Sequence, residues 1–195
     1  MSIVLYDAER CPYCARARIV LAEKGLAYET VTIDLARRPA FLYAKNPLGK
    51  VPVLEEDTLC LDESAVIMEY LNERYPEPPL LPLHAGERAL ARLAVWRFEE
   101  ELGSAYYALR RGAEGAREAL DRSLSALEAR LRERPFLAGS SYSLADIAWF
   151  PWLPRAQRYF GIDFGPYPSI ASWLERLARR PAIAAELDLV SSLAA

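Results

Sequence analysis

Two cysteines, Cys11 and Cys14, stand three positions apart in the segment Arg-Cys-Pro-Tyr-Cys. The pair follows a short apolar run at residues 3–6 and precedes a run whose apolar residues recur at helical spacing. Pro12 suits the first position of a helix, because the N–H that it lacks would have no partner there. Cys11 is then the N-cap, where free N–H groups and the helix dipole favour a thiolate over a thiol. The pattern therefore predicts a thiolate nucleophile at the N-terminus of a helix.

Composition narrows the class of protein. The chain has 195 residues, of which 52% are hydrophobic, so it can bury a core in one large domain or two small ones. A net charge of −3 gives no strongly basic surface, and we expect no nucleic-acid partner. No stretch approaches the ~20 apolar residues that a membrane span needs, and the first residues do not resemble a secretory leader. We therefore expect a cytoplasmic protein that does not bind a membrane.

The cysteine pair could hold a metal, carry out redox chemistry or form part of an inert core. A closed zinc site needs four ligands. The other candidate ligands are Cys60 and the only histidine, His84, and neither belongs to a second paired motif. We therefore expect no metal and favour redox or nucleophilic chemistry. Cys60 stands between two leucines in a strand pattern and is expected to be a packed, unreactive thiol.

The residues around the pair predict a strand, a helix and a second strand over residues 3–6, 12–24 and 28–33. Gly25 closes the helix, because glycine adopts without strain the left-handed conformation that follows a helix C-terminus. A strand–helix–strand unit of this length implies a parallel pair with a right-handed crossover. We expect Arg16, Arg18 and Lys24 to point outward from the helix.

Downstream, the sequence predicts a turn, two strands of a hairpin and a helix over residues 46–49, 51–54, 58–61 and 64–75. Pro52 lies near the start of the first of these strands, and a proline cannot donate to a sheet ladder. It must therefore occupy an edge strand or a special site. Ser64 is the natural N-cap of the helix that follows.

Residues 77–85 form a proline-rich linker, which is stiff and extended. This linker divides the chain into an N-terminal domain at 1–76 and a C-terminal domain at 86–195. Strand patterns disappear after it, and helices are predicted over about 87–111, 115–134, 167–179 and 181–190. The second half is therefore predicted to be entirely helical.

A further helix should begin after Ser143, with Asp146 as its capping-box partner. Its composition is apolar on nearly all sides, so its first N–H groups cannot rely on water and need the box. Replacing such a cap costs ~1 kcal/mol and up to ~2. Trp149 and Trp152 could border a substrate pocket, but on a buried helix they are more simply core residues.

The N-terminal half, headed by Cys11-Pro12-Tyr13-Cys14, resembles a thioredoxin-like domain with the glutaredoxin form of the motif. The helical half that follows the linker is similar to that of soluble glutathione transferases. The resemblance covers essentially the whole chain and rests on four segments, residues 11–14, 46–54, 62–64 and 143–146. It points to the cysteine-type transferases, omega-like and related bacterial forms. It implies an α/β thioredoxin-like domain followed by an all-α domain.

The resemblance implies roles for residues around the thiol. Cys11 matches the nucleophile that forms a mixed disulfide with glutathione. Val51 matches the residue whose backbone pairs with the cysteinyl part of glutathione, as an added strand would. Pro52 matches the family's cis-proline, although the residues alone leave an ordinary edge-strand proline open. Cys14 departs from the single cysteine of many relatives, and it could resolve a mixed disulfide internally.

The resemblance also implies how the rest of glutathione is held. Glu63 matches the residue that takes the γ-glutamyl ammonium, while Ser64 and its helix N-terminus take the carboxylate. Arg38 falls where omega-like members place a basic residue near the glycyl carboxylate. From the residues alone, Ser64 could be a plain helix cap and Glu63 a solvated charge. Arg10 and Arg16 would add positive charge near the nucleophile.

Glutathione as co-substrate and a small electrophilic or disulfide substrate follow from the resemblance. Because two cysteines are present, glutathione-dependent thiol–disulfide exchange or reductive transfer is favoured over aromatic conjugation. One alternative is a regulatory or binding protein on the same scaffold, similar to the stringent starvation proteins that contact RNA polymerase. Another is a transferase-fold enzyme, such as a dehalogenase or isomerase, that uses another thiol. Most relatives are dimers, so a homodimer is expected.

Overall fold

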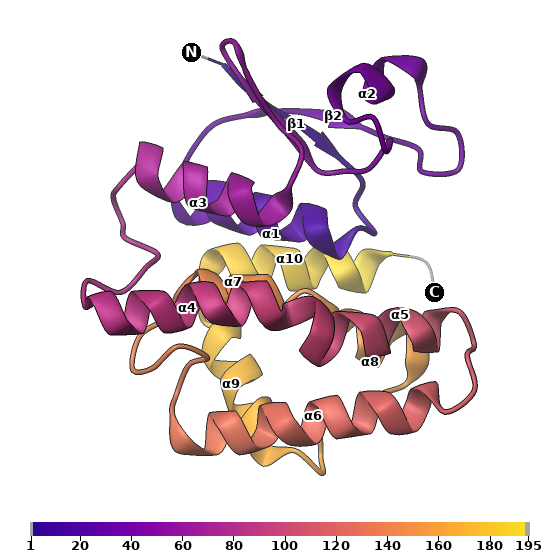
Figure 1. Ribbon diagram of the computed structural model, residues 1–195, viewed down its shortest axis with the longest axis vertical. Helices are drawn as coiled ribbons and strands as arrows, with labels where there is room; N and C mark the ends of the chain where they lie inside the picture. Colours follow the sequence, from indigo (N-terminus) through magenta and orange to yellow (C-terminus); the bar gives the residue numbers. More distant parts are fainter. Residues whose placement is uncertain (1, 194–195) are drawn as a thin grey trace. The chain divides into compact units, whose positions relative to one another are not determined.

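The computed structural model describes residues 2–193 and divides into two compact units, Met1–Pro79 and Leu80–Ala195 (Figure 1). All strands of the described part lie in the first unit, and the second is built from helices. The predicted fold class, an α/β thioredoxin-like half followed by a helical half, is confirmed. The boundary between the units falls within residues 77–85. The limits predicted for the linker stay a prediction, and the last two residues of the predicted domain at 86–195 lie outside the described part.

The sheet of the first unit joins strands from both ends of that unit. Its members are β1 (Ile3–Asp7), β2 (Glu29–Thr32), β3 (Val53–Glu56) and β4 (Leu59–Leu61), in the order β2-β1-β3-β4. β1 pairs parallel with β2 and antiparallel with β3, with Leu5 opposite Thr30 on one side and Leu54 on the other. Leu5 and Leu54 are fully buried, so the core of this unit sits on the central strands.

Three helices accompany the sheet, α1 (Pro12–Glu23), α2 (Ala40–Lys45) and α3 (Ser64–Arg74). α1 is the crossover between β1 and β2, and α1 and α3 pack side by side (Figure 1). Gly25 follows the C-cap of α1 with a φ of +63°, which confirms its predicted role. β3 begins at Val53 rather than at residue 51, because Pro52 has no N–H for the ladder.

Two of the three basic residues expected to point outward from α1 are buried. Arg16 is 4% exposed, and Lys24 is 8% exposed. Lys24 Nζ donates to Asn72 Oδ1 at 3.0 Å and to the Pro78 carbonyl at 2.6 Å. The expectation was wrong because helical spacing does not reveal that α3 packs along this side of α1. The long side chains bury their stems there and carry their charged ends to polar partners.

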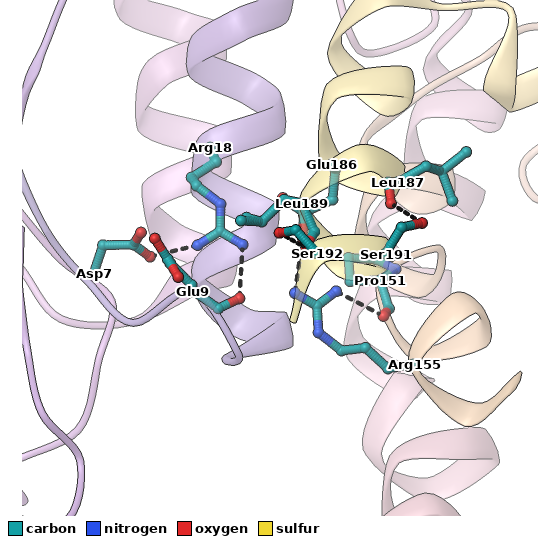
Figure 2. Close-up of polar contacts among 10 residues, drawn as sticks. All are labelled: Asp7, Glu9, Arg18, Pro151, Arg155, Glu186, Leu187, Leu189, Ser191 and Ser192. Atoms are coloured by element: carbon teal, nitrogen blue, oxygen red, sulfur yellow. Dashed lines mark hydrogen bonds and ion pairs between the residues drawn. The ribbon is translucent and has the colours of Figure 1, made fainter. Parts of the chain in front are cut away.

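The third basic residue, Arg18 of α1, contacts the segment that connects β1 to α1. Its guanidinium donates to Asp7 Oδ1 at 2.5 Å and to the Glu9 carbonyl at 3.4 Å (Figure 2). These contacts fix the segment that leads from β1 into the cysteine motif. Arg18 therefore supports the backbone just before Cys11.

The second unit holds α4 (Ala85–Phe98), η1 (Glu99–Gly103), α5 (Ser104–Arg110), α6 (Ala116–Glu133), α7 (Leu144–Trp149), α8 (Trp152–Phe160), α9 (Pro168–Ala178) and α10 (Pro181–Ser192). The single helix predicted over 87–111 is therefore interrupted by η1, a π-helical stretch. α4 buries Ala91, Ala94 and Phe98, and it leaves Leu90 and Leu93 partly exposed. No helix of the described part is long and apolar enough to span a membrane.

The predicted capping box is present at the start of α7. Ala145 N–H donates to Ser143 Oγ at 3.3 Å, and Ser143 N–H donates to Asp146 Oδ2 at 2.9 Å. Asp146 Oδ1 accepts from Leu137 N–H at 3.0 Å and from Trp173 Nε1 at 2.9 Å. Burial nevertheless raises the pKa of Asp146 to about 6. The box thus ties the start of α7 to the preceding loop and to α9.

A buried ion pair and a buried carboxylate also hold the helices of this unit together. Arg155 of α8 donates to Glu186 of α10 at 2.8 Å and to the Pro151 carbonyl at 3.1 Å (Figure 2). Glu128 of α6 accepts the backbone N–H groups of Ser169 and Ile170, each at 2.9 Å, and so caps the N-terminus of α9. These three charged residues therefore serve helix packing within the second unit.

Candidate active site

Cys11 is the N-cap of α1, as predicted. Its backbone is extended (φ −79°, ψ 116°), and Pro12 takes the first helical position. The side chain makes no capping hydrogen bond to the helix. Instead, Sγ lies 3.7 Å from the carbonyl oxygen of Val51, to which the thiol can donate. The sulfur therefore sits beside the helix N-terminus, where the dipole favours a negative charge.

Cys14 lies one turn further along α1 and is fully buried. It belongs to an apolar cluster with Tyr6, Leu42 and Val51, against which Cys11 is packed. Burial raises the pKa of the Cys14 thiol well above its ordinary value, and its hydrogen bond and electrostatic interaction with Cys11 raise it further. Cys14 is therefore a protonated thiol that faces its more exposed neighbour.

The segment that carries Val51 is fixed by a tight turn. Asn46 Oδ1 accepts from Leu48 N–H at 2.9 Å, and Asn46 Nδ2 donates to the Lys50 carbonyl at 3.3 Å. Gly49 has a φ of +60°, which favours glycine, and a Cβ there would lie 2.6 Å from the Tyr43 ring, which would have to shift. The turn leads directly into the segment whose carbonyl faces Cys11.

Val51 and Pro52 are both buried, and the peptide bond between them is cis. A cis bond at this place is what the resemblance implied. That Val51 and Pro52 bind glutathione stays a prediction. The contact between Val51 and the Cys11 sulfur is made by the Val51 backbone carbonyl.

Ser64 begins α3, but it is not the N-cap as predicted. Glu63 occupies that position with extended backbone (φ −114°, ψ 119°) and makes no side-chain capping bond. Ser64 is the first helical residue, and its buried Oγ accepts a hydrogen bond from Arg16 Nη1 at 3.2 Å. The prediction missed by one residue because serine is only a statistical cap signal. Here its hydroxyl is directed to a cation.

α3 is held in place by a buried carboxylate of the sheet. Glu56 of β3 accepts from the Tyr70 hydroxyl at 2.7 Å and from the Tyr75 hydroxyl at 2.5 Å. The bond to Glu56 and burial raise the pKa of Tyr75 to about 12, so the phenol stays a donor. Anchoring the end of α3 in this way positions its first turn, where Ser64 lies.

The remaining predicted residues lie apart from this arrangement. Arg38 is exposed in the loop between β2 and α2, and it makes no hydrogen bond or ion pair to another residue in 2–193. Glu63 is also exposed. Cys60 was expected to be packed, but it is exposed, because β4 is a short edge strand. No group of three or more His, Cys, Asp and Glu side chains in the described part could hold a metal ion.

Tyr6 lies in the same cluster as the cysteines, but its phenol is already engaged. The hydroxyl donates to Glu55 Oε2 at 2.7 Å, and Lys45 also binds Glu55. Burial and the Glu55 charge raise the pKa of Tyr6. The phenol is therefore held protonated, which leaves Cys11 as the better nucleophile of this cluster.

Sequence reasoning missed Arg16 as a neighbour of Ser64. The residue was expected to face solvent, whereas its guanidinium bonds Ser64 and lies 5.2 Å from the centroid of the Tyr13 ring. The signal that could have found it is the position of Arg16 relative to its own helix. Arg16 lies one helical turn after Pro12, on the side of α1 that packs against α3.

Comparisons with known proteins identify the family of this chain. Residues 5–79 match the family Glutathione S-transferase, N-terminal domain, and residues 98–176 match Glutathione S-transferase, C-terminal domain. The stringent starvation protein A homolog of Pasteurella multocida is 34% identical over 184 residues, which cover 91% of this chain and 86% of that protein. Glutathione S-transferase omega-1 of Mus musculus is 34% identical over 161 residues, covering 80% of this chain and 67% of that protein.

A solved structure of glutathione S-transferase-I bound with lactoylglutathione has a TM-score of 0.83. It is 25% identical and covers 97% of this chain and 100% of its own. The two family matches together span well over half of the sequence, and they fall on the two units of the fold. The chain belongs to the glutathione S-transferase family.

Proposed function

We propose that this chain catalyses glutathione-dependent thiol–disulfide exchange on a small substrate, with Cys11 as the nucleophile. The observation that carries the proposal is the pairing of a half-buried Cys11 at the N-terminus of α1 with a fully buried Cys14 whose pKa is raised. A helix N-terminus favours the thiolate, and a protonated partner one turn away can form a disulfide with it.

The reaction runs in two exchange steps. The Cys11 thiolate attacks the glutathione sulfur of a mixed disulfide between glutathione and a substrate. A Cys11–glutathione disulfide forms, and the substrate leaves as a thiolate that takes a proton from water. The thiolate of a second glutathione then attacks the bound glutathione sulfur, which releases oxidised glutathione and restores the Cys11 thiolate. In the net reaction one free glutathione is oxidised while the substrate half of the mixed disulfide is reduced to a thiol, so electrons balance.

Cys14 offers a second route from the same intermediate. Its sulfur, after losing its proton to water, attacks the Cys11 sulfur and expels bound glutathione as a thiolate. The resulting Cys11–Cys14 disulfide is then reduced by two glutathione molecules. The Val51 backbone beside cis-Pro52, together with Glu63 and Ser64, would hold glutathione in the orientation that both routes need. Arg38 would meet the glycyl carboxylate from its exposed loop.

The first test compares three proteins in glutathione-dependent reduction of a mixed disulfide of glutathione and 2-mercaptoethanol. We expect the unmodified chain to turn over and Cys11→Ser to lose at least about a thousandfold in kcat/KM, because a serine hydroxyl is not ionised. Cys14→Ser should keep activity if the first route dominates. Measurable turnover by Cys11→Ser at the original rate would refute the proposal.

A second candidate function is that of a regulatory or binding protein on the same scaffold. The observation in its favour is the similarity to the stringent starvation protein A homolog. A chain of that kind would show neither glutathione binding nor turnover in the same assay. The cytoplasmic location and homodimeric state expected from the sequence fit either candidate and belong to the proposal.

A further inference from the structure

Arg16 connects the cysteine motif to Ser64. Its Nη1 donates to Ser64 Oγ at 3.2 Å, and its Cζ lies 5.2 Å from the centroid of the Tyr13 ring. The residue is only 4% exposed, and Ser64 is buried to the same degree. One guanidinium therefore contacts both Tyr13, which lies between the two cysteines in the sequence, and the first residue of α3.

The hydrogen bond from Arg16 determines whether the Ser64 hydroxyl can donate a hydrogen bond to a ligand. A hydroxyl has one proton to donate and two lone pairs that accept. Arginine has no acceptor, so it occupies a lone pair of Oγ and leaves the Ser64 proton to be donated elsewhere. No described residue accepts that proton. The contact therefore leaves Ser64 set as a donor toward an external acceptor.

The charge of Arg16 determines which acceptor is preferred. The guanidinium remains protonated at every physiological pH, and its charge acts strongly because the side chain is buried. The N-terminus of α3, where Ser64 is the first helical residue, adds partial positive charge on the same side. An anion bonded to Ser64 would therefore lie near both sources of positive potential.

We infer that Arg16 is a positioning residue that selects the γ-glutamyl carboxylate of glutathione. It orients the Ser64 hydroxyl toward that carboxylate and places a fixed positive charge behind it. The inference rests on the proposed function, because it names how the same site recognises its thiol co-substrate. Its consequence is discrimination between glutathione and thiols that lack a γ-glutamyl group.

The test uses the full chain and bis(2-hydroxyethyl) disulfide as substrate, which contains no glutathione of its own. Glutathione and cysteinylglycine are compared as reducing thiols, since the latter lacks the γ-glutamyl group. We expect Arg16→Met to raise KM for glutathione by about tenfold or more while kcat changes less than about twofold. The value of kcat/KM with cysteinylglycine should stay within about twofold of the unmodified chain.

Two further variants separate the effect of the Arg16 charge from that of its planar geometry, and both from the loss of any positive charge in this unit. Arg16→Lys keeps the charge but loses the planar fork, so its KM for glutathione should lie between those of the unmodified chain and Arg16→Met. Arg37→Met removes an exposed arginine of the same unit, whose one ion-pair partner among residues 2–193 is Asp34. It should leave both thiols unaffected.

If Arg16→Met fails to fold, as judged by circular dichroism, Arg16→Lys carries the test in two backgrounds. Arg16→Lys should raise the KM for glutathione in the chain that retains Ser64. It should have no effect on that KM in the Ser64→Ala background, because Arg16 acts through the Ser64 hydroxyl. The same effect in both backgrounds would overturn the inference.

Other outcomes are equally decisive. An unchanged KM for glutathione in Arg16→Met would overturn the inference, as would an equal fall in kcat/KM for both thiols. If the unmodified chain does not use glutathione at all, the proposed function and the inference fail together. If it does, and the Arg16 variants match it, only the inference fails.

Discussion

Buried polar groups serve different purposes in the two units. In the first, Ser64 accepts one hydrogen bond from Arg16 and keeps a proton that no described residue accepts. In the second, Asp146 receives four hydrogen bonds from within the chain, two of them from Ser143. The first arrangement leaves capacity for a ligand. The second uses its capacity entirely for structure.

The comparison teaches that burial of a polar group does not by itself mark a site. Arg155 and Glu186 are as deeply buried as Arg16, and they form an ion pair with each other. Asp146 has a pKa raised to about 6, which by value alone would suggest chemistry. Its neighbours are backbone N–H groups, a serine and a tryptophan that hold helices together. What separates the two kinds of group is whether their hydrogen-bonding capacity is spent inside the chain.

The largest effect on stability is expected from breaking the buried ion pair. Arg155→Met leaves Glu186 buried without its partner and should cost about 3–5 kcal/mol in the free energy of unfolding. Urea denaturation at neutral pH measures this directly. Arg37→Met, which breaks an exposed pair, is the control and should be indistinguishable from the unmodified chain. A loss equally small in both variants would show that the Arg155–Glu186 pair does not stabilise the second unit.

A smaller effect should appear as a pH dependence at Asp146. Its folded pKa of about 6 exceeds the ordinary value of 3.8, so the folded state binds the proton more tightly. This contribution is fully present below about pH 4 and is lost as the pH rises through about 6. It amounts to about 3 kcal/mol.

The measurement is the unfolding free energy of the unmodified chain and of Asp146→Asn from about pH 4 to about pH 7. Asparagine does not titrate, so the advantage of the unmodified chain should be greatest at the acidic end. A difference between the two proteins that stays constant over this range would contradict the raised pKa.

The smallest effect is expected from Glu128. Burial raises the pKa of this carboxyl, but the N–H groups of Ile170 and Ser169 outweigh burial and bring the pKa below its ordinary value. Its stabilisation is therefore present above the ordinary pKa and is lost as the pH falls through the lowered one. Glu128→Gln should cost about 1–2 kcal/mol at neutral pH, measured by thermal or urea unfolding. If Glu128→Gln keeps the KM for glutathione of the unmodified chain, its loss of stability is purely structural. A raised KM in this variant would contradict the contrast drawn between the buried polar groups of the two units.

Much of the fold follows from local signals in the sequence. The proline after Cys11, the glycine after Lys24 and the Ser143–Asp146 box act within one helical turn, and all lie where they were predicted. The switch from strands to helices after the proline-rich segment is visible in the periodicity of the residues.

What sequence reasoning missed depends on contacts between distant segments. Arg16 and Lys24 look like solvated charges until α3 packs beside α1. Cys60 looks like a core residue until β4 proves to be the short edge strand of the sheet. The π-helical stretch Glu99–Gly103 interrupts a pattern that reads as one helix. Local propensity carries no information about any of these neighbours.

The most direct test of the central claim is to trap the intermediate on Cys11. Cys14→Ser is incubated with oxidised glutathione, and the intact mass and the modified peptide are determined. The account predicts one glutathione per chain, bound to Cys11, while the exposed Cys60 serves as an internal control for non-specific reaction. Modification of Cys60 in preference to Cys11, or no adduct at all, would contradict a thiolate nucleophile at the start of α1.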